Sequence, residues 1–242
     1  MYHLIKVVDL IVGVETHYNL LETRLAQYIV LEDSLTPVFN LEVSEEEIAK
    51  LKIKAPNLTS EECEYIISGA EFYKKILDYN AFFLHASAVV VNNVAYAFSA
   101  NSGVGKSTHT KLYLKYFPDS YIINDDKPVI KYKDDKFYIY GTPWSGKDDC
   151  SRASSVLLGG LCFIKRGIDN KVIKLERKDA LIRILTQTLR IKSIDKYNIL
   201  LNLLDKFLKT YDVYEIYADI SKDAVLKSYE ALSKNNKGED IL

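Results

Sequence analysis

The chain has few cysteines and no large excess of charge of either sign. Among its 242 residues are 3 cysteines, 32 basic side chains and 33 acidic ones, for a formal net charge of −1. Three cysteines without a CxxC pair argue against a disulfide framework or a zinc site and favour free thiols in a reducing cytoplasm. Because no basic excess is available to neutralise phosphates, we exclude nucleic acid as the main partner.

Long apolar runs are also absent. The first residues do not read as a signal peptide, and no apolar run approaches the length of about 18 residues that marks a membrane helix. We therefore expect a cytoplasmic protein that does not bind membranes. The hydrophobic content of 48% and the charged content of 27% are those of an ordinary globular protein.

One strong motif is present. Residues 100–108 read ANSGVGKST, the phosphate-binding pattern A/G-x-x-x-x-G-K-S/T. Such a loop wraps backbone N–H groups around nucleotide phosphates, while its lysine, Lys106, reaches the β- and γ-phosphates and its serine, Ser107, ligates Mg²⁺. An apolar strand over 94–98 leads in and a helical run over 106–116 leads out, as the motif requires. The predicted nucleotide-binding residues are Asn101, Ser102, Gly103, Val104, Gly105, Lys106, Ser107 and Thr108.

Two adjacent carboxylates follow this motif. Asp125 and Asp126 end a short apolar run over residues 121–126, where a carboxylate of Walker-B type supports Mg²⁺. Successive residues of a strand point to opposite sides, so the two acids are expected to have different roles. The alternative is a plain turn, which the sequence Asn-Asp-Asp-Lys-Pro also favours.

His85 is the third candidate. It lies on the first arm of a predicted hairpin, residues 82–91 and 94–99, whose turn is Asn92-Asn93. Residues paired across this turn have numbers that sum to about 185, so His85 is expected near Ala100, with its imidazole beside the Asp125 carboxylate. The alternative is a histidine satisfied within the core. His109, just inside the predicted helix, is expected on the helix surface.

A polar loop over residues 141–152 carries Trp144, Lys147 and Arg152. A cation near the γ-phosphate would stabilise charge during transfer, and Arg152 is the candidate for that role. The alternative is a polar surface loop with Trp144 packed beneath it.

The pattern predicts an α/β (α+β) protein with mixed sheets around the phosphate-binding loop and flanking helices. Residues 1–80 are expected to be strand-rich and helical and to pack on the same domain, residues 81–234 to form the nucleotide-binding domain, and residues 235–242 to fray. Within these parts we expect strands over 4–14, 23–31, 129–132, 136–140, 156–164 and 213–217, and helices over 59–79, 178–190, 194–209 and 222–232.

The order of these motifs resembles the HPr kinase/phosphorylase-like family, within the larger group that includes ATP-dependent phosphoenolpyruvate carboxykinase. The resemblance covers most of residues 82–232. It rests on Leu84-His85-Ala86-Ser87, the hairpin, the loop over 101–108, the Asp125-Asp126 pair, and a closing strand and helix. Residues 141–147 stand where HPr kinases carry a Gly/Arg-rich signature, so the likeness is to the family and not to HPr kinase itself.

The resemblance implies a fold like the C-terminal domain of HPr kinase and a role for each candidate residue. His85 would lie beside the acceptor, and Asp125 would be the base that activates a hydroxyl. Asp126 would hold Mg²⁺ together with Ser107, while Lys106 would bind the phosphates.

We therefore predict an ATP- and Mg²⁺-dependent kinase that transfers the γ-phosphate to a hydroxyl, in a serine of a peptide or protein or in a small metabolite. Two alternatives stay open: a nucleotide-binding regulatory protein without turnover, and a stand-alone ATPase. The expected partners are the nucleotide and an unidentified hydroxyl-bearing molecule. The sequence leaves open whether the chain forms a homo-oligomer.

Overall fold

Residues 1–32 and 34–236, which the computed structural model describes, form two β-sheets with helices packed around them. The fold is mixed α/β, as the sequence predicts. The helices are α1 (Asn19–Leu25), α2 (Glu45–Lys54), α3 (Ser60–Lys75), α4 (Lys106–Tyr116), α5 (Arg177–Thr186), α6 (Ile194–Thr210) and α7 (Lys222–Ser233). Short 3₁₀ turns are η1 (Ala26–Tyr28), η2 (Ile76–Tyr79) and η3 (Lys234–Asn236). None of the helices in this part of the chain is long and apolar enough to cross a membrane.

The smaller sheet lies near the N-terminus, in the order β1-β2-β3. Its strands are β1 (Tyr2–Val7), β2 (Leu10–Glu15) and β3 (Phe39–Leu41). The expected strand over 23–31 is wrong: α1 begins at Asn19, and Leu21 and Leu25 are buried one helical turn apart. Helix α2 was not predicted, although Ser44 and Glu47 form a capping box at its start.

The larger sheet has the order β4-β8-β9-β10-β6-β5-β7, with β12 paired to β10 and β11 to β12. Strand β10 is the longest and joins the two halves of the sheet, because it pairs antiparallel with β9 and parallel with β6 and β12. The strands are β4 (Ala81–Phe83), β5 (Ala86–Val91), β6 (Val94–Ser99), β7 (Tyr121–Asn124), β8 (Val129–Lys133), β9 (Lys136–Tyr140), β10 (Ser155–Arg166), β11 (Lys171–Lys174) and β12 (Val213–Ala218).

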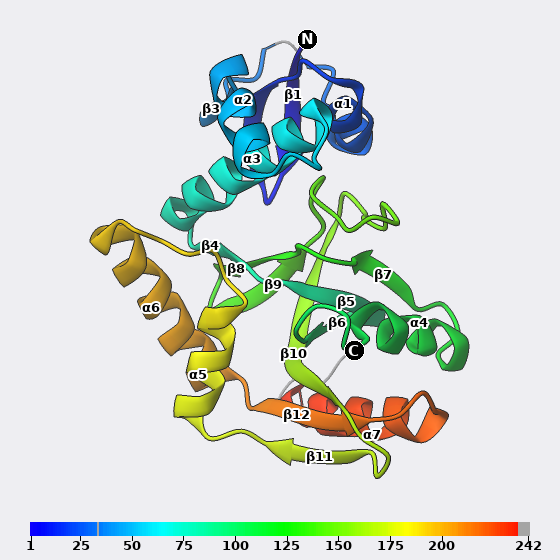
Figure 1. Ribbon diagram of the computed structural model, residues 1–242. Helices are drawn as coiled ribbons and strands as arrows, with labels where there is room; N and C mark the ends of the chain where they lie inside the picture. The colour runs from blue at the N-terminus through cyan, green and yellow to red at the C-terminus, as the bar shows by residue number, and fades with distance from the viewer. Residues whose placement is uncertain (33, 237–242) are drawn as a thin grey trace.

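Strands β5 and β6 are buried on both faces, which explains their nearly continuous apolar sequence. On one face, Ala88 and Val90 belong to a cluster with residues of α5 and α6. On the other, Val89 and Val91 pack with residues of α4 and α7. In Figure 1, α5 and α6 lie to one side of the sheet and α4 and α7 to the other.

The predicted hairpin is confirmed. Strands β5 and β6 pair antiparallel from Ala86 opposite Ser99 to Val91 opposite Val94, so the paired numbers sum to 185. Asn92 and Asn93 both have positive φ, as a two-residue hairpin turn requires. The expected long first arm is divided, however: β4 pairs with β8, and Leu84 and His85 lie between β4 and β5.

The region of residues 1–80 shares a core with the larger sheet. Side chains of β1, β2, α1 and α3 form one buried cluster with Val129, Tyr140 and Trp144. The expected helix over 59–79 is present as α3 followed by η2: α3 begins with a capping box of Thr59 and Glu62 and leads through η2 into β4 (Figure 1). Of the expected frayed tail, Asn235 and Asn236 belong to η3, and residues 237–242 lie outside the described residues.

Candidate functional site

The phosphate-binding pattern forms a loop between β6 and α4. Gly103 and Gly105 have φ angles of 77° and 123°, which other residues rarely adopt. The loop turns back on itself through a hydrogen bond of 3.2 Å from Val104 N to Asn101 O. Helix α4 then begins at Lys106, so the loop amides and the helix N-terminus form one positively polarised surface.

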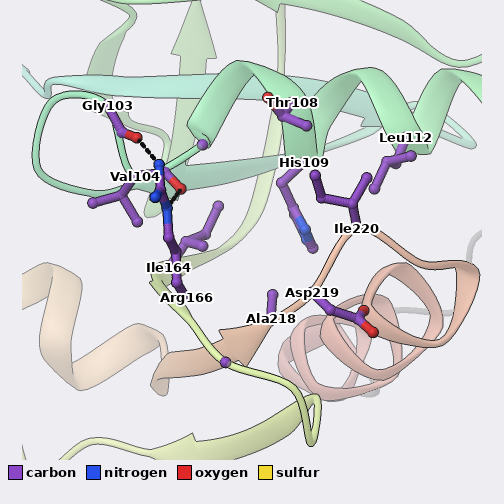
Figure 2. Close-up of a pocket in the computed structure, with 12 residues that line it drawn as sticks. Gly103, Val104, Thr108, His109, Leu112, Ile164, Arg166, Ala218, Asp219 and Ile220 are labelled. Carbon is purple, nitrogen blue, oxygen red and sulfur yellow. Dashed lines mark hydrogen bonds between the residues drawn. The ribbon is translucent and has the colours of Figure 1, made fainter.

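Arg166, at the end of β10, holds this loop from outside. Its Nη2 donates to Gly103 O at 2.7 Å and its Nε to Val104 O at 3.4 Å. A cavity of about 560 Å³ lies between the loop, α4 and the turn before α7. Figure 2 shows the Arg166 side chain among the residues that line it. The sequence carried no motif that pointed to Arg166.

His109 does not lie on the helix surface, which corrects the expectation. It is 3% exposed, and its Nε2 lies 3.1 Å from Ser228 Oγ on α7. Burial lowers its pKa to about 4, so the ring is neutral near pH 7. The covering helix α7 comes from more than a hundred residues downstream, which the local sequence could not reveal.

Lys106 points inward from the first turn of α4. The residue is 9% exposed, and its Nζ lies 3.0 Å from His85 Nε2 and 3.4 Å from Ala100 O. Burial lowers its pKa, while the charges of Asp126 and Asp125 act in the opposite direction. Lys106 and His85 thus meet at the mouth of the loop, where the hairpin register predicts the histidine.

The carboxylate that His85 contacts is Asp126, so the expected pairing with Asp125 is wrong. His85 Nε2 lies 3.2 Å from Asp126 Oδ1. The reason is a turn: Asn124 Oδ1 accepts hydrogen bonds from Asp126 N at 3.0 Å and Lys127 N at 2.7 Å. Ala86 N also donates to Asp126 O at 3.1 Å, which fixes Asp126 beside the histidine. The turn that was the alternative interpretation of this segment is present, and it sets the directions of the Asp125 and Asp126 side chains.

Gln187, just after α5, anchors the imidazole from the other side. Gln187 Oε1 lies 2.9 Å from His85 Nδ1, and Gln187 O accepts from His85 N at 2.8 Å. His85 Nε2 therefore faces both an ammonium that only donates and a carboxylate that only accepts. A ring protonated on Nδ1 alone accepts from Lys106, whereas an imidazolium donates to Asp126.

Asp126 stays ionised in this setting. Burial acts to raise its pKa, but the hydrogen bond from His85 and the nearby Lys127 ammonium outweigh burial and lower it well below the usual range. Lys127 Nζ lies 2.8 Å from Asp126 Oδ2. Both oxygens of this carboxylate thus face nitrogen donors, and the side chain is still 25% exposed.

Asp125 points toward α4 instead. Ser87 Oγ donates to Asp125 Oδ1 at 2.6 Å and lies 2.8 Å from Thr110 Oγ1. Thr110 in turn donates to Ser107 O at 3.2 Å. Asp125 is therefore linked through Ser87 and Thr110 to the first turn of α4, which carries Ser107.

The loop over residues 141–152 crosses the two carboxylates. A Cβ on Gly146 would lie 3.4 Å from Asp126 Cβ and 3.8 Å from Asp125 Oδ2. The expected charge-stabilising role of Arg152 does not fit its position: its guanidinium stacks on the Tyr121 ring at 4.1 Å, at the start of β7, while the carboxylates follow the end of that strand. Trp144 is buried, as the alternative reading of this loop proposed.

Residues far away in the sequence hold this loop. Arg24 of α1 donates to Ser145 Oγ at 3.0 Å and Gly146 O at 3.3 Å, and it forms an ion pair with Asp149. Tyr65 of α3 donates to Ser145 O at 2.6 Å. Sequence reasoning missed these contacts because no local pattern marks them.

No protein-family model matches the chain, and no curated protein matches it. Within residues 1–32 and 34–236, no group of three or more His, Cys, Asp or Glu side chains is placed to hold a metal ion. Function must therefore be inferred from the geometry of the site.

Proposed function

We propose that the chain is an ATP- and Mg²⁺-dependent kinase of the HPr kinase/phosphorylase-like type, acting in the cytoplasm on a hydroxyl of a serine or of a small metabolite. The observation that carries the proposal is the contact chain from Lys106 through His85 to Asp126, at 3.0 Å and 3.2 Å. It joins the lysine of a phosphate-binding loop to an ionised carboxylate. Phosphoryl transfer needs these two groups close together, one on the donor and one on the acceptor.

The donor side is the loop and α4. Amides of residues 101–107 and the ammonium of Lys106 would bind the β- and γ-phosphates, since both loop glycines have the backbone angles that such a cradle uses. The cavity beside Arg166, about 560 Å³, has room for the nucleoside and includes the apolar side chains of Leu112, Ile164 and Ile220.

The metal side would be Ser107 and Asp125. A hydroxyl and a carboxylate are oxygen ligands of the kind that Mg²⁺ takes, usually one or two from the protein with phosphate and water completing the set. Asp125 fits because it is linked through Ser87 and Thr110 to the turn of Ser107. When bound, the metal neutralises charge on the phosphates.

The acceptor side would be Asp126. As the acceptor oxygen bonds to the γ-phosphorus and the bond from that phosphorus to the β,γ-bridging oxygen breaks, Asp126 accepts the hydroxyl proton and ADP leaves. Lys127 and His85 orient the carboxylate. When Lys106 moves onto phosphate, His85 Nε2 loses a competing donor and is left to Asp126 alone.

The site also bears on the two alternatives, and the cysteines bear on the compartment. Asp126 is exposed enough for water to reach it. If water takes the place of the hydroxyl acceptor, the same site would hydrolyse ATP, and the protein would be a stand-alone ATPase. A nucleotide-binding protein without turnover has no need of the ionised Asp126 held by His85. The three free cysteines, of which Cys63 and Cys162 are buried, support a reducing compartment.

The test is transfer of label from γ-labelled ATP in the presence of Mg²⁺ and cell extract. We expect a labelled peptide, protein or small molecule with the natural chain and none with Lys106→Ala. Release of inorganic phosphate alone, at the same rate with and without extract, would favour the ATPase. Binding of ATP without either product would favour the regulatory protein.

A further inference from the structure

A cavity of about 180 Å³ lies between α3, β4 and the loop after β9, outside the nucleotide site. Its wall is aromatic and aliphatic apart from Lys127. Ile66, 43% exposed, forms its outer rim, so the cavity opens to the surface. Among the side chains that line it are Tyr65, Ile66, Ala70, Phe83, Trp144 and Leu189.

The wall is built before any ligand arrives. Trp144 stacks on Phe72, with ring centroids 4.6 Å apart, and its Nε1 donates to Ser68 Oγ at 3.1 Å. Gly69 lets the indole approach the helix, because a Cβ there would lie 2.6 Å from Trp144 Cδ1. A preformed apolar cavity binds a ligand of matching size without the cost of ordering its own side chains.

Three chain segments connect this cavity to the carboxylate that faces His85. Phe83 precedes His85 by two residues, and Leu189 follows its anchor Gln187 by two. Lys127 lines the cavity, lies over the Tyr65 ring at 5.7 Å and bonds to Asp126 Oδ2 at 2.8 Å. A group bound in the cavity is therefore one lysine side chain away from Asp126.

We propose that this cavity binds the apolar part of the phosphoryl acceptor, and that the acceptor is an alcohol whose hydroxyl-bearing carbon carries a phenyl-sized group. The inference rests on the proposed kinase function. Size supports it, since an apolar protein cavity of roughly 150 Å³ holds a benzene molecule. An alcohol on a short arm from such a ring would place its oxygen beside Lys127, the lining residue that bonds to Asp126.

The experiment uses benzyl alcohol as the probe. Its binding to the natural chain is measured by saturation-transfer NMR and titration, and compared with methanol, which has the hydroxyl without the ring. Ala70→Leu fills the cavity from α3, and Leu189→Trp fills it from the opposite wall, so one variant that fails to fold does not end the test. Ala49→Leu, the same change at an exposed position of α2, is the matched control.

We expect benzyl alcohol to bind the natural chain and Ala49→Leu alike, and methanol to bind neither measurably. Each cavity-filling variant should weaken benzyl alcohol binding roughly 10- to 100-fold while ATP affinity stays unchanged. Unchanged benzyl alcohol binding in a folded cavity-filling variant, or no binding to the natural chain, would overturn the inference. So would self-association of the natural chain that Ala70→Leu abolishes, because a second copy would then fill the cavity.

The binding readout does not need nucleotide, so it separates this inference from the kinase proposal. Failure of the chain to bind ATP would contradict the proposed function while the cavity result stood. With both bound, ³¹P NMR should show benzyl phosphate forming with the natural chain and Ala49→Leu, and far less with Ala70→Leu.

Discussion

The two sheets of the molecule differ in what they contribute to the candidate site. The larger sheet and its connections carry Lys106, His85 and Asp126, which contact one another in that order, and Asp125, which accepts a hydrogen bond from Ser87. The region around the smaller sheet adds no candidate catalytic group. Its helices instead hold the loop that lies over the carboxylates, through Arg24 and Tyr65.

In our proposal, the larger sheet supplies the reacting groups, and the N-terminal region holds the loop that shapes the site around them. Loops on a rigid scaffold commonly carry function, and here helix α3 of the N-terminal region both holds such a loop and lines the cavity of about 180 Å³ that we propose for the acceptor. Changes in the larger sheet should therefore abolish the reaction itself. Changes in the N-terminal region should alter how well the site is assembled and which acceptor fits.

The largest effect is expected from Lys106→Ala, which removes one of the candidate reacting groups of the larger sheet. Removing the ammonium should lower ATP turnover roughly 1000-fold or more, because the phosphates lose the one buried cation of the loop. ATP affinity and label transfer are the measurements. The matched control is Lys111→Ala on the same helix, whose ammonium pairs with Asp148 at the surface. Equal activity of the two variants would mean that the loop does not bind ATP productively.

The next largest effects should distinguish the proposed roles of Asp126 and Asp125. Asp126→Asn should keep Mg²⁺-dependent ATP binding and lose transfer roughly 100- to 1000-fold, because the group that accepts the hydroxyl proton is gone. Asp125→Asn should raise the Mg²⁺ concentration needed for half-maximal activity by roughly tenfold. Titrating Mg²⁺ with both variants checks this. If the two defects are exchanged, the original reading of Asp125 as the base is restored.

A third prediction concerns the stability of the larger region. Burial lowers the pKa of His109 from 6.5 to about 4, so between these values the unfolded chain binds a proton that the folded chain does not. The free energy of unfolding should therefore fall as pH drops from 6.5 toward 4, by about 3 kcal/mol from this group. Urea unfolding of the natural chain and of His109→Gln at both pH values measures it. Parallel curves for the two proteins would rule out this contribution.

The smallest effect should come from the N-terminal region. Arg24→Leu removes the hydrogen bond to Gly146 O and the ion pair with Asp149, so residues 145–149 should open more often. We expect kcat/KM to fall roughly tenfold with ATP affinity unchanged, and faster hydrogen exchange confined to this loop. Arg177→Leu, which breaks a surface ion pair with Asp205, is the control and should change neither. A loss of activity as large as that of Lys106→Ala would contradict the view that the N-terminal region affects only the assembly of the site.

Much of the larger sheet could be predicted from local pattern. The hairpin register, the loop and α4 follow from apolar runs, paired asparagines and a glycine-rich motif. In the N-terminal region, residues 23–31 look like a strand by composition, but Leu21 and Leu25 form the buried stripe of α1. Apolar spacing over so short a segment fits both structures, and only packing against α3 and the small sheet selects the helix.

The amino-acid pattern alone is enough to predict the glycine-rich loop over residues 100–108, the position of His85 at its mouth and helix α3, because each depends on residues close along the chain or on one hairpin register. The contact of His85 with Asp126, the burial of His109 and the hydrogen bond from Arg24 to Gly146 follow from the three-dimensional packing. These facts depend on elements separated by tens to more than a hundred residues. Where such distant elements come into contact, packing and long-range hydrogen bonds set the directions of the side chains. Neither produces a periodic pattern of apolar residues in the sequence.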